Sequence, residues 1–248
     1  MLRKSISSRQ VLVLAILATV LSEVACAFRR GQTFQSFVTP TPLPTNSTLI
    51  LGFLGGREPW DNDNRNVRKL ALKLRAMNLP GVQVETVENT KRHLALELIR
   101  QAFDRNKDGR LDAEEREAVR LILYGQSFGG AAVVKLAREL NEMNAPVLLT
   151  VQVDSVGRGD AVIPSNVARA ANLYQRDGLF IRGEPEIRAE DPRKTKILGN
   201  FRFHYRGKKI DLSGVSWAKK VFRMAHTKMD SDPDVWAQVE RLILAEIQ

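Results

Sequence analysis

The sequence has very little cysteine and histidine. Among 248 residues it contains one cysteine, Cys26, and three histidines, His93, His204 and His226. A single cysteine excludes a small scaffold held together by internal disulfides. Because Cys26 lies close to the N-terminus, a chain that loses its first residues keeps no cysteine at all. Such a protein must be stabilised by its apolar core, and a bound metal is the other feature that could add to its stability.

The sequence also lacks internal repeats, low-complexity segments and collagen-like periodicity, so its composition is that of an ordinary globular protein. Its length is enough to bury a sizeable core in one large domain or two small ones. The formal net charge is +10, and part of it lies in the first ten residues. Nothing in this balance points to a nucleic-acid ligand.

The N-terminal residues have the pattern of a secretory signal. Basic residues precede a short apolar run at 11–21, and Ala25-Cys26-Ala27 resembles a signal-peptidase site. We therefore expect residues 1–27 to be a signal peptide that is cleaved after Ala27, which predicts a secreted or periplasmic protein. The alternative is an uncleaved segment that anchors the protein to a membrane, although the run is short for a span.

A segment at 28–46 follows, with three prolines and no helical period, and it predicts an extended leader. The domain is expected at 47–248. Its first strand is predicted at 48–54, followed by a helix at 64–77, a strand at 82–88 and a helix at 91–103. A short helix at 113–119, a strand at 120–125, a helix at 129–143 and strands at 147–154 and 168–175 come next.

Alternating strands and helices, with nearly continuous apolar strands, predict an α/β fold: a mainly parallel sheet with helices on both faces. The remainder is less regular. Residues 201–212 could form a hairpin that turns at Gly207, and an amphipathic helix capped by Asp232 or Ser231 is predicted to end the chain.

Residues 104–115, DRNKDGRLDAEE, match the calcium-loop pattern of an EF-hand. The expected ligands stand at the required spacing: Asp104, Asn106, Asp108, the carbonyl of Arg110, Asp112 and Glu115. Gly109 stands where the loop turns sharply. Because this loop has no second copy, we expect Ca²⁺ to have a structural role and not to act as a sensor.

Gly125-Gln126-Ser127-Phe128-Gly129 matches G-x-S-x-G between a predicted strand and a predicted helix. In that context the turn exposes the serine hydroxyl, and the two glycines avoid clashes around it. The amide of Phe128 begins the helix and can face a developing oxyanion. A glycine-rich turn without any chemistry is the simpler alternative.

With this turn, the first-strand segment LGFLGG, the strand end VQVDSVG and the late MAHTKMD, residues 48–248 resemble the α/β-hydrolase family. The closest type is a small lipase- or esterase-like serine hydrolase with a minimal cap or none. The resemblance implies a Ser-His-Asp triad in that chain order. It assigns the base to His226, in a loop before the last helix, and the acid to Asp154, with Asp177 as the alternative one strand later.

The resemblance also implies a second oxyanion donor after the first strand, where related lipases often have His-Gly-aromatic. This sequence has Leu51-Gly52-Phe53, so the histidine is absent, and the donor is expected to be the amide of Phe53 or else that of Leu54. Together, Ser127, His226, Asp154, Phe53 and Phe128 predict hydrolysis of a small-molecule or lipid ester.

The alternative is a non-catalytic calcium-binding surface protein on a hydrolase scaffold, whose basic stretch at 188–223 would bind an acidic polymer or lipid surface. A solvated basic face explains the same charges more simply. The two hypotheses differ in one geometric requirement. Only the enzyme needs Ser127, His226 and an aspartate to converge.

Overall fold

A computed structural model describes residues 31–178, 181–213 and 224–247, and all of them except Gly31 belong to one unit that begins at Gln32. The predicted signal peptide and Cys26 lie outside the described residues. Within the described residues, no helix is both long enough and apolar enough to span a bilayer.

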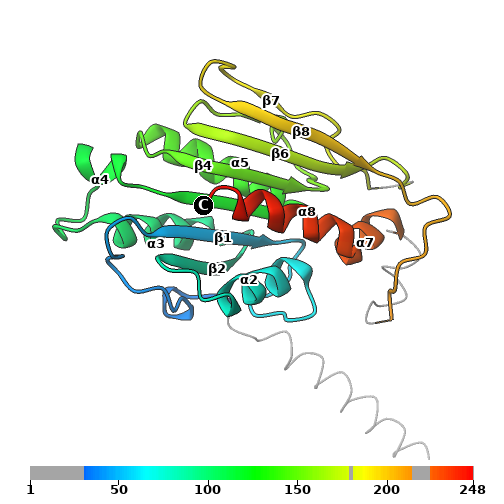
Figure 1. The fold of residues 1–248 in the computed structure, drawn as a ribbon, viewed down its shortest axis with the longest axis horizontal. Coiled ribbons are helices and arrows are strands. Elements are labelled where there is room, and N and C mark those ends of the chain that lie inside the picture. The colour runs from blue at the N-terminus through cyan, green and yellow to red at the C-terminus, as the bar shows by residue number, and fades with distance from the viewer. Residues whose placement is uncertain (1–30, 179–180, 214–223, 248) are drawn as a thin grey trace, which may run out of the picture. The chain divides into compact units, whose positions relative to one another are not determined.

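The centre of the unit is a six-stranded parallel sheet with the strand order β2-β1-β3-β4-β6-β8. The strands are β1 (Thr48–Leu54), β2 (Val82–Glu88), β3 (Leu121–Gln126), β4 (Val147–Val153), β6 (Val167–Gln175) and β8 (Lys196–Phe203). Every residue of β1 and β3 is buried, which explains their continuous apolar sequence. All carboxyl ends point the same way (Figure 1).

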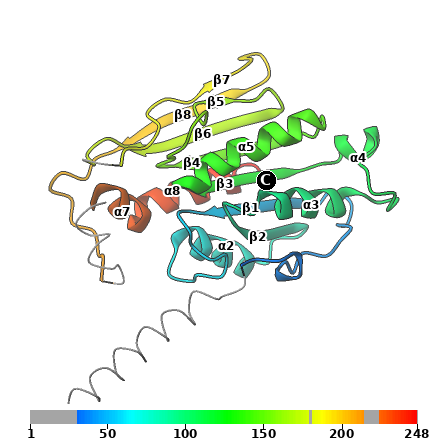
Figure 2. The ribbon, with the colours of Figure 1, turned by 180° about the vertical axis from the view of Figure 1, so that it is seen from behind.

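Helices cover both faces of this sheet. Helices α2 (Asn66–Ala76) and α8 (Pro233–Leu244) lie on the face that is turned to the viewer in Figure 1. Helices α3 (Arg92–Phe103) and α5 (Phe128–Glu142) lie on the other face, which Figure 2 shows from behind. Each face has its own cluster of buried apolar side chains. The predicted α/β class with a parallel sheet between helices is confirmed.

The shorter elements sit around the rim. They are η1 (Phe34–Ser36), α4 (Ala113–Glu117), β5 (Val162–Ile163), β7 (Arg188–Ala189) and α7 (Met224–Ser231), and β5 pairs with β7. Between β4 and β8 the described chain contains only strands and loops, so no helical cap is inserted there.

Two local expectations were wrong. Residues 201–203 end the parallel edge strand β8, and the described residues 204–213 form no returning strand, so there is no hairpin at Gly207. His226 lies in helix α7 and not in a loop. By contrast, Asp232 does cap the last helix, because its side chain accepts a hydrogen bond from the amide of Asp234, with Pro233 in the first turn.

Residues 32–46 are held against the sheet. The side chain of Gln32 donates to the carbonyl of Thr86, and the buried Glu85 carboxylate accepts hydrogen bonds from the amides of Val38 and Thr39. Leu43 is buried, and its amide donates to the carbonyl of Ala102 in α3. This segment therefore contributes to the packed structure of the domain.

Candidate active site

The turn after β3 puts Ser127 in a rare backbone conformation, with φ 58° and ψ −124°. Its amide donates to the carbonyl of Val153, and its own carbonyl accepts from the amide of Val156, so the turn is fixed to the end of β4. A non-glycine residue with positive φ persists only where its surroundings determine it. This backbone is the sharp strand-to-helix turn that the G-x-S-x-G pattern predicts.

The two glycines of the pattern permit close backbone contacts. A Cβ on Gly125 would lie 2.5 Å from the carbonyl carbon of Gly129, and a Cβ on Gly129 would overlap the carbonyl oxygen of Phe53. Any side chain at either position would push the first turn of α5 away from strands β1 and β3. Glycine at both positions therefore fixes where Ser127 lies.

His226 and Asp154 lie together at the same end of the sheet. The Nδ1 atom of His226 is 2.6 Å from Oδ2 of Asp154, which follows the last residue of β4. Asp154 is fully buried, and Ser127 and His226 are each 7% exposed. A carboxylate in hydrogen-bond contact with Nδ1 favours the tautomer in which Nε2 carries a lone pair and can accept a proton.

Asp154 is itself held by neighbours that the sequence patterns did not single out. The backbone amide of Gln175 donates to its Oδ1 at 3.3 Å, and the side-chain amide of Gln175 donates to its Oδ2 at 3.0 Å. Asp154 also has a positive φ of 43°. Gln175 ends β6, the neighbouring parallel strand, and its position at that carboxyl end was the only signal that could have indicated this role.

Asp177, the alternative acid, has a different set of partners. Its Oδ2 accepts hydrogen bonds from the amides of Tyr205 and Arg206, at 2.6 and 3.3 Å. The hydrogen bond from the Tyr205 amide, more than any other interaction, lowers the pKa of Asp177 below its ordinary value. The nearest histidine nitrogen is that of His204, at 4.0 Å. Asp177 thus holds the loop after β8, and the acid beside His226 is Asp154.

Of the other two histidines, His93 is exposed on α3, and the side chain of His204 is 65% exposed. Only His226 has a buried carboxylate at hydrogen-bond distance among the described residues. His226 and Asp154 are thus in direct contact, and Ser127 and His226 line the same pocket.

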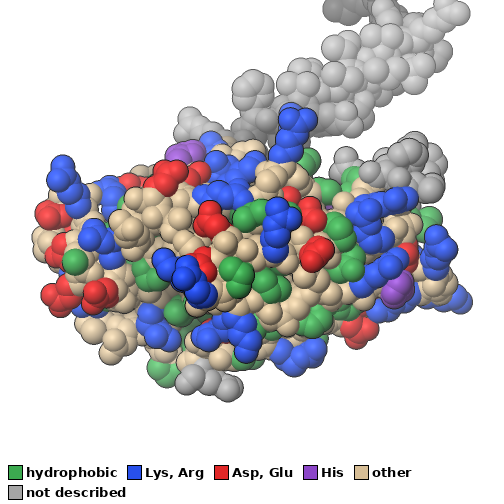
Figure 3. Space-filling model, turned by 90° about the horizontal axis from the view of Figure 1, so that it is seen from above, with side chains coloured by type: hydrophobic (Ala, Val, Ile, Leu, Met, Phe, Trp, Pro, Cys, Tyr) green, Lys and Arg blue, Asp and Glu red, His purple; other side chains and the backbone are tan. Residues whose placement is uncertain are grey.

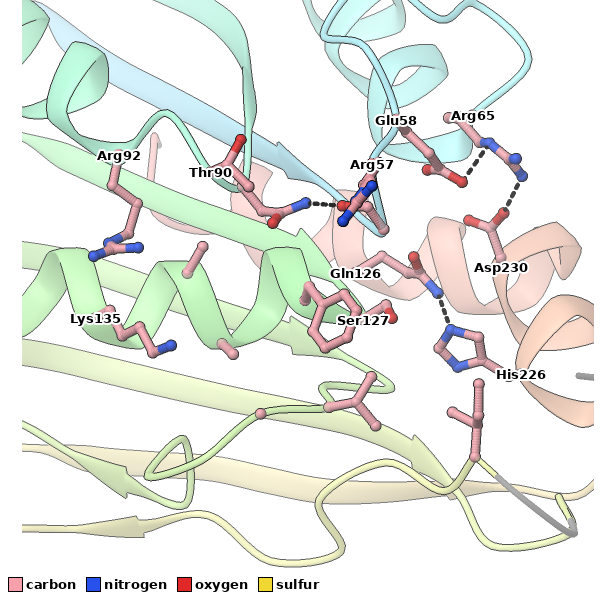
Figure 4. A pocket seen from close by; sticks show the side chains of 18 of the residues that line it. Arg57, Glu58, Arg65, Thr90, Arg92, Gln126, Ser127, Lys135, His226 and Asp230 are labelled. Atoms are coloured by element: carbon pink, nitrogen blue, oxygen red, sulfur yellow. Dashed lines mark hydrogen bonds and ion pairs between the residues drawn. The ribbon is translucent and has the colours of Figure 1, made fainter. Parts of the chain in front are cut away.

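Gln126 is a neighbour of the histidine that was not predicted. Its Nε2 lies 3.2 Å from Nε2 of His226, on the nitrogen that would have to accept the serine proton. In Figure 4 the Ser127 hydroxyl points toward the same imidazole. The side-chain amide of Gln126 therefore occupies the ring nitrogen opposite the one that contacts Asp154.

The oxyanion donors need one correction. Phe128 is the first residue of α5, where helix geometry supplies no intrahelical acceptor for its amide, as predicted. Phe53, however, lies inside β1 and is paired in register with Val87 on one side and Gly125 on the other. Leu54, the alternative, also belongs to that strand.

The turn beyond β1 is better placed for the second donor. A Cβ on Gly55 would lie 3.2 Å from Cβ of Ser127, and Gly56 and Arg57 line the same pocket as the serine. The glycine pair directly follows the predicted strand, so the sequence indicated this turn. Which backbone amides near it are free of the sheet depends on how β1 pairs with both neighbours, and no local pattern encodes that pairing.

These groups open into a pocket of about 940 Å³. Ser127 and His226 line it together with Phe128 and Ile181. Polar residues also line it from the turn after β1, from helices α3, α5 and α7 and from the loop after β4. The side chain of Phe128 is 55% exposed, which is unusual for a large apolar group. A concave site of this size, with apolar and polar side chains around it, is large enough for a small organic molecule.

The acidic loop lies elsewhere. It joins α3 to α4 ahead of β3, whereas Ser127 follows the other end of that strand (Figure 1). The amide of Gly109, which has a φ of +86°, donates to Oδ2 of Asp104. Oδ1 of Asp104 is buried and has no hydrogen-bond partner among the described residues. An unpaired buried carboxylate oxygen fits a site for a hard cation.

Other features of the loop fit a metal less well. Glu115, the expected bidentate ligand, accepts hydrogen bonds from the amides of Arg105 and Asn106 on one oxygen and of Asp112 on the other. In the part of the chain that the structure describes, no three histidine, cysteine or acidic side chains converge to hold a metal ion. Backbone amides thus close the loop around Glu115.

Comparisons with known proteins give little beyond this geometry. No family model matches the chain, and no curated protein matches it. Among solved structures, dienelactone hydrolase from Anabaena variabilis is similar, with a TM-score of 0.40 and 12% sequence identity over 81% of this chain and 86% of that one. The assignment of individual residues therefore rests on the contacts described above.

Proposed function

We propose that this protein is a serine hydrolase that cleaves carboxylic esters or related acyl bonds. The observation that carries the proposal is the 2.6 Å contact between His226 Nδ1 and Asp154 Oδ2 beside a serine with a positive φ. A strained serine that lines a pocket and a histidine oriented by a buried acid are the parts that nucleophilic acyl transfer requires.

In this mechanism Oγ of Ser127 attacks the acyl carbon, and its proton passes to Nε2 of His226. Asp154 keeps the Nδ1 proton in place and stabilises the imidazolium that forms. The amide of Phe128 and an amide of the turn at residues 55–57 stabilise the oxyanion. The imidazolium then protonates the leaving alkoxide, and water, deprotonated by the same histidine, releases the acid from the acyl-enzyme.

The test is a comparison of Ser127→Ala with Ser165→Ala, a serine in the turn between β5 and β6. Both are assayed on short p-nitrophenyl esters and with a fluorophosphonate probe. We expect Ser127→Ala to lose turnover by at least about 10³-fold and to lose labelling, whereas Ser165→Ala keeps both. Unchanged labelling of the Ser127→Ala protein would exclude the proposal.

We further infer that residues 104–115 bind Ca²⁺ in a structural role, on the strength of the ligand spacing and the unpaired buried oxygen of Asp104. Calcium at about 100 times its Kd would add roughly 2.7 kcal/mol to the free energy of unfolding. The melting temperature should then rise by about 5–10 °C over its value in a chelator.

The control for calcium is Asp63→Asn, which changes an exposed acid outside the loop, and the test variant is Asp104→Asn. The rise in melting temperature with calcium should persist in Asp63→Asn and vanish in Asp104→Asn. Turnover of the folded enzyme should change little when the chelator is added. An identical melting temperature with calcium and with chelator would mean that the hydrogen bonds to Glu115 close the loop without a metal.

Secretion also remains a proposal, supported by the basic start, the apolar run and the Ala25-Cys26-Ala27 site. Expression in a host with an export pathway, followed by mass spectrometry of the mature protein, tests it. We expect an N-terminus at Phe28. Recovery of the intact chain from the membrane fraction would support the anchored alternative.

A further inference from the structure

The pocket extends from Ser127 along one face of helix α5. Phe128, Ala131, Ala132 and Lys135 all line it, and their spacing of three, four and seven residues puts them on one side of the helix. Lys135 lies eight residues beyond Ser127, which corresponds to about 12 Å at 1.5 Å per residue. The groove therefore has the serine near one end and a lysine at the other, with alanine methyl groups between them.

A second cation flanks the same part of the helix. In the loop after β4, a Cβ on Gly157 would overlap Cβ of Ala131, and the carbonyl of Gly159 accepts a hydrogen bond from Arg138. Arg158 stands between these two contacts, so its backbone runs beside α5 at the level of Lys135. The side chains of both Arg158 and Lys135 are exposed, and both line the pocket.

Their charges are not neutralised within the described part of the chain, where neither Lys135 nor Arg158 has an ion pair. Arg92, a third cation at this end, is paired with Glu139 at 3.0 Å. Figure 4 shows Arg92 and Lys135 on the side of the pocket away from His226.

The acids that line the pocket gather at its other end. Glu58 and Asp230 both contact Arg65, at 2.8 and 3.4 Å. The Lys135 end therefore has positive charge without a lining acid, and such a groove attracts an anion.

We propose that the ester substrate carries an anionic group at the far end of its chain, which Lys135 and Arg158 bind while the ester carbonyl lies at Ser127. This inference rests on the proposed function, since it takes Ser127 as the reacting residue. The apolar part of the substrate lies over Phe128 and the methyl groups of Ala131 and Ala132. The separation between the carbonyl and the anion is set by the distance of about 12 Å along α5.

The probes are p-nitrophenyl monoesters of linear dicarboxylic acids of increasing length, each compared with the same ester whose free carboxyl is methylated. We expect kcat/KM to favour the free acid by about fivefold once the chain can span the groove, and hardly at all for the shortest acids. The preference should shrink in high salt, because exposed charges are screened. A matched ester that ends in phosphate shows whether carboxylate or phosphate is the preferred anion.

The variants are Lys135→Gln, Arg158→Gln and the double substitution, with Lys69→Gln on α2 as a control cation outside the pocket. The ratio of kcat/KM for free acid to methylated ester should fall to about one in the double variant and stay unchanged in Lys69→Gln. A wild-type enzyme without the preference, or a double variant that keeps it, overturns the inference.

Failure of the proposed function would look different. In that case wild type and Ser127→Ala would hydrolyse the methylated esters at the same rate, or neither of the two proteins would hydrolyse them. A Ser127-dependent esterase that is indifferent to the terminal charge would refute the anion site alone.

Discussion

At the scale of single residues, the two aspartates that follow neighbouring strands have separate tasks. Asp154 contacts His226 and receives two hydrogen bonds from Gln175, whereas Asp177 receives the amides of Tyr205 and Arg206. The two residues have similar positions in the sequence, each at the carboxyl end of a parallel strand. Substituting each one by asparagine should therefore separate chemistry from stability.

Asp154→Asn should lower kcat by about 10³- to 10⁴-fold with little change in KM. An asparagine can present its N–H₂ group to Nδ1, which leaves the proton on Nε2 and prevents this atom from accepting the serine proton. Steady-state kinetics on a p-nitrophenyl ester measure the effect, with circular dichroism to verify folding. An activity within tenfold of wild type would remove Asp154 from the triad.

Asp177→Asn should instead change the response to acid. Because the folded-state pKa of Asp177 is lowered, its carboxylate adds stability that is present above the unfolded pKa, near 3.9. That stability is lost as the pH falls through the folded pKa. The variant should thus be less stable than wild type at neutral pH, and the difference should narrow below about pH 4. Urea unfolding at several pH values measures it, and a difference that does not depend on pH would contradict this account.

At the scale of secondary-structure elements, the site depends on how closely α5 approaches β1. The sequence predicted both elements because strands and helices leave local periodic patterns, and it predicted the serine turn because that turn needs glycines at fixed positions. It placed the second oxyanion donor at Phe53, inside β1, because which amides of a strand are taken up by the sheet depends on its pairing with β2 and β3. The contact of Gln126 with His226 joins residues 100 apart, and no local pattern encodes it.

Gly129→Ala tests that close approach. The added methyl group would overlap the carbonyl oxygen of Phe53 and lie 2.9 Å from that of Leu54, both backbone atoms of a buried strand that cannot move aside cheaply. We expect a loss of about 1–3 kcal/mol in unfolding free energy, together with a large fall in kcat as the serine turn shifts. Glu142→Ala, at an exposed position on the same helix, is the control. A Gly129→Ala enzyme with normal stability and turnover would show that the turn tolerates displacement.

At the scale of the whole molecule, basic and acidic side chains are mixed on the face that Figure 3 shows. Figure 3, which looks onto the top of the view in Figure 1, shows lysine and arginine side chains dispersed among acidic and apolar ones. Several basic residues of the stretch at 188–223 also have acidic partners, such as Arg193 with Asp191 and Lys208 with Asp232. This arrangement is that of a solvated surface, and it leaves the unpaired cations of the pocket as the more specific feature.

The N-terminal segment extends the domain beyond its predicted boundary. A sequence with prolines and no period gives no local reason to pack, so the contacts of residues 32–46 could not be read from it. They depend on Glu85, which is fully buried in β2, pairs with Arg75 at 2.6 Å and accepts hydrogen bonds from Val38 and Thr39. Without the segment, one oxygen of a buried carboxylate loses these donors.

A chain that begins at Pro44 should therefore be less stable than one that begins at Phe28. The shorter chain loses the burial of Leu43, worth roughly 2–3 kcal/mol, and leaves Glu85 partly unsatisfied at a cost of about 1–3 kcal/mol. The combined loss of about 3–6 kcal/mol should lower the melting temperature by roughly 10–20 °C. Thr39→Val in the longer chain removes only the 2.9 Å hydrogen bond from the threonine hydroxyl and should cost about 1 kcal/mol. Equal melting temperatures for the two chains would mean that residues 28–43 contribute nothing to the fold, because a packed segment cannot be removed without exposing the surface that it covers.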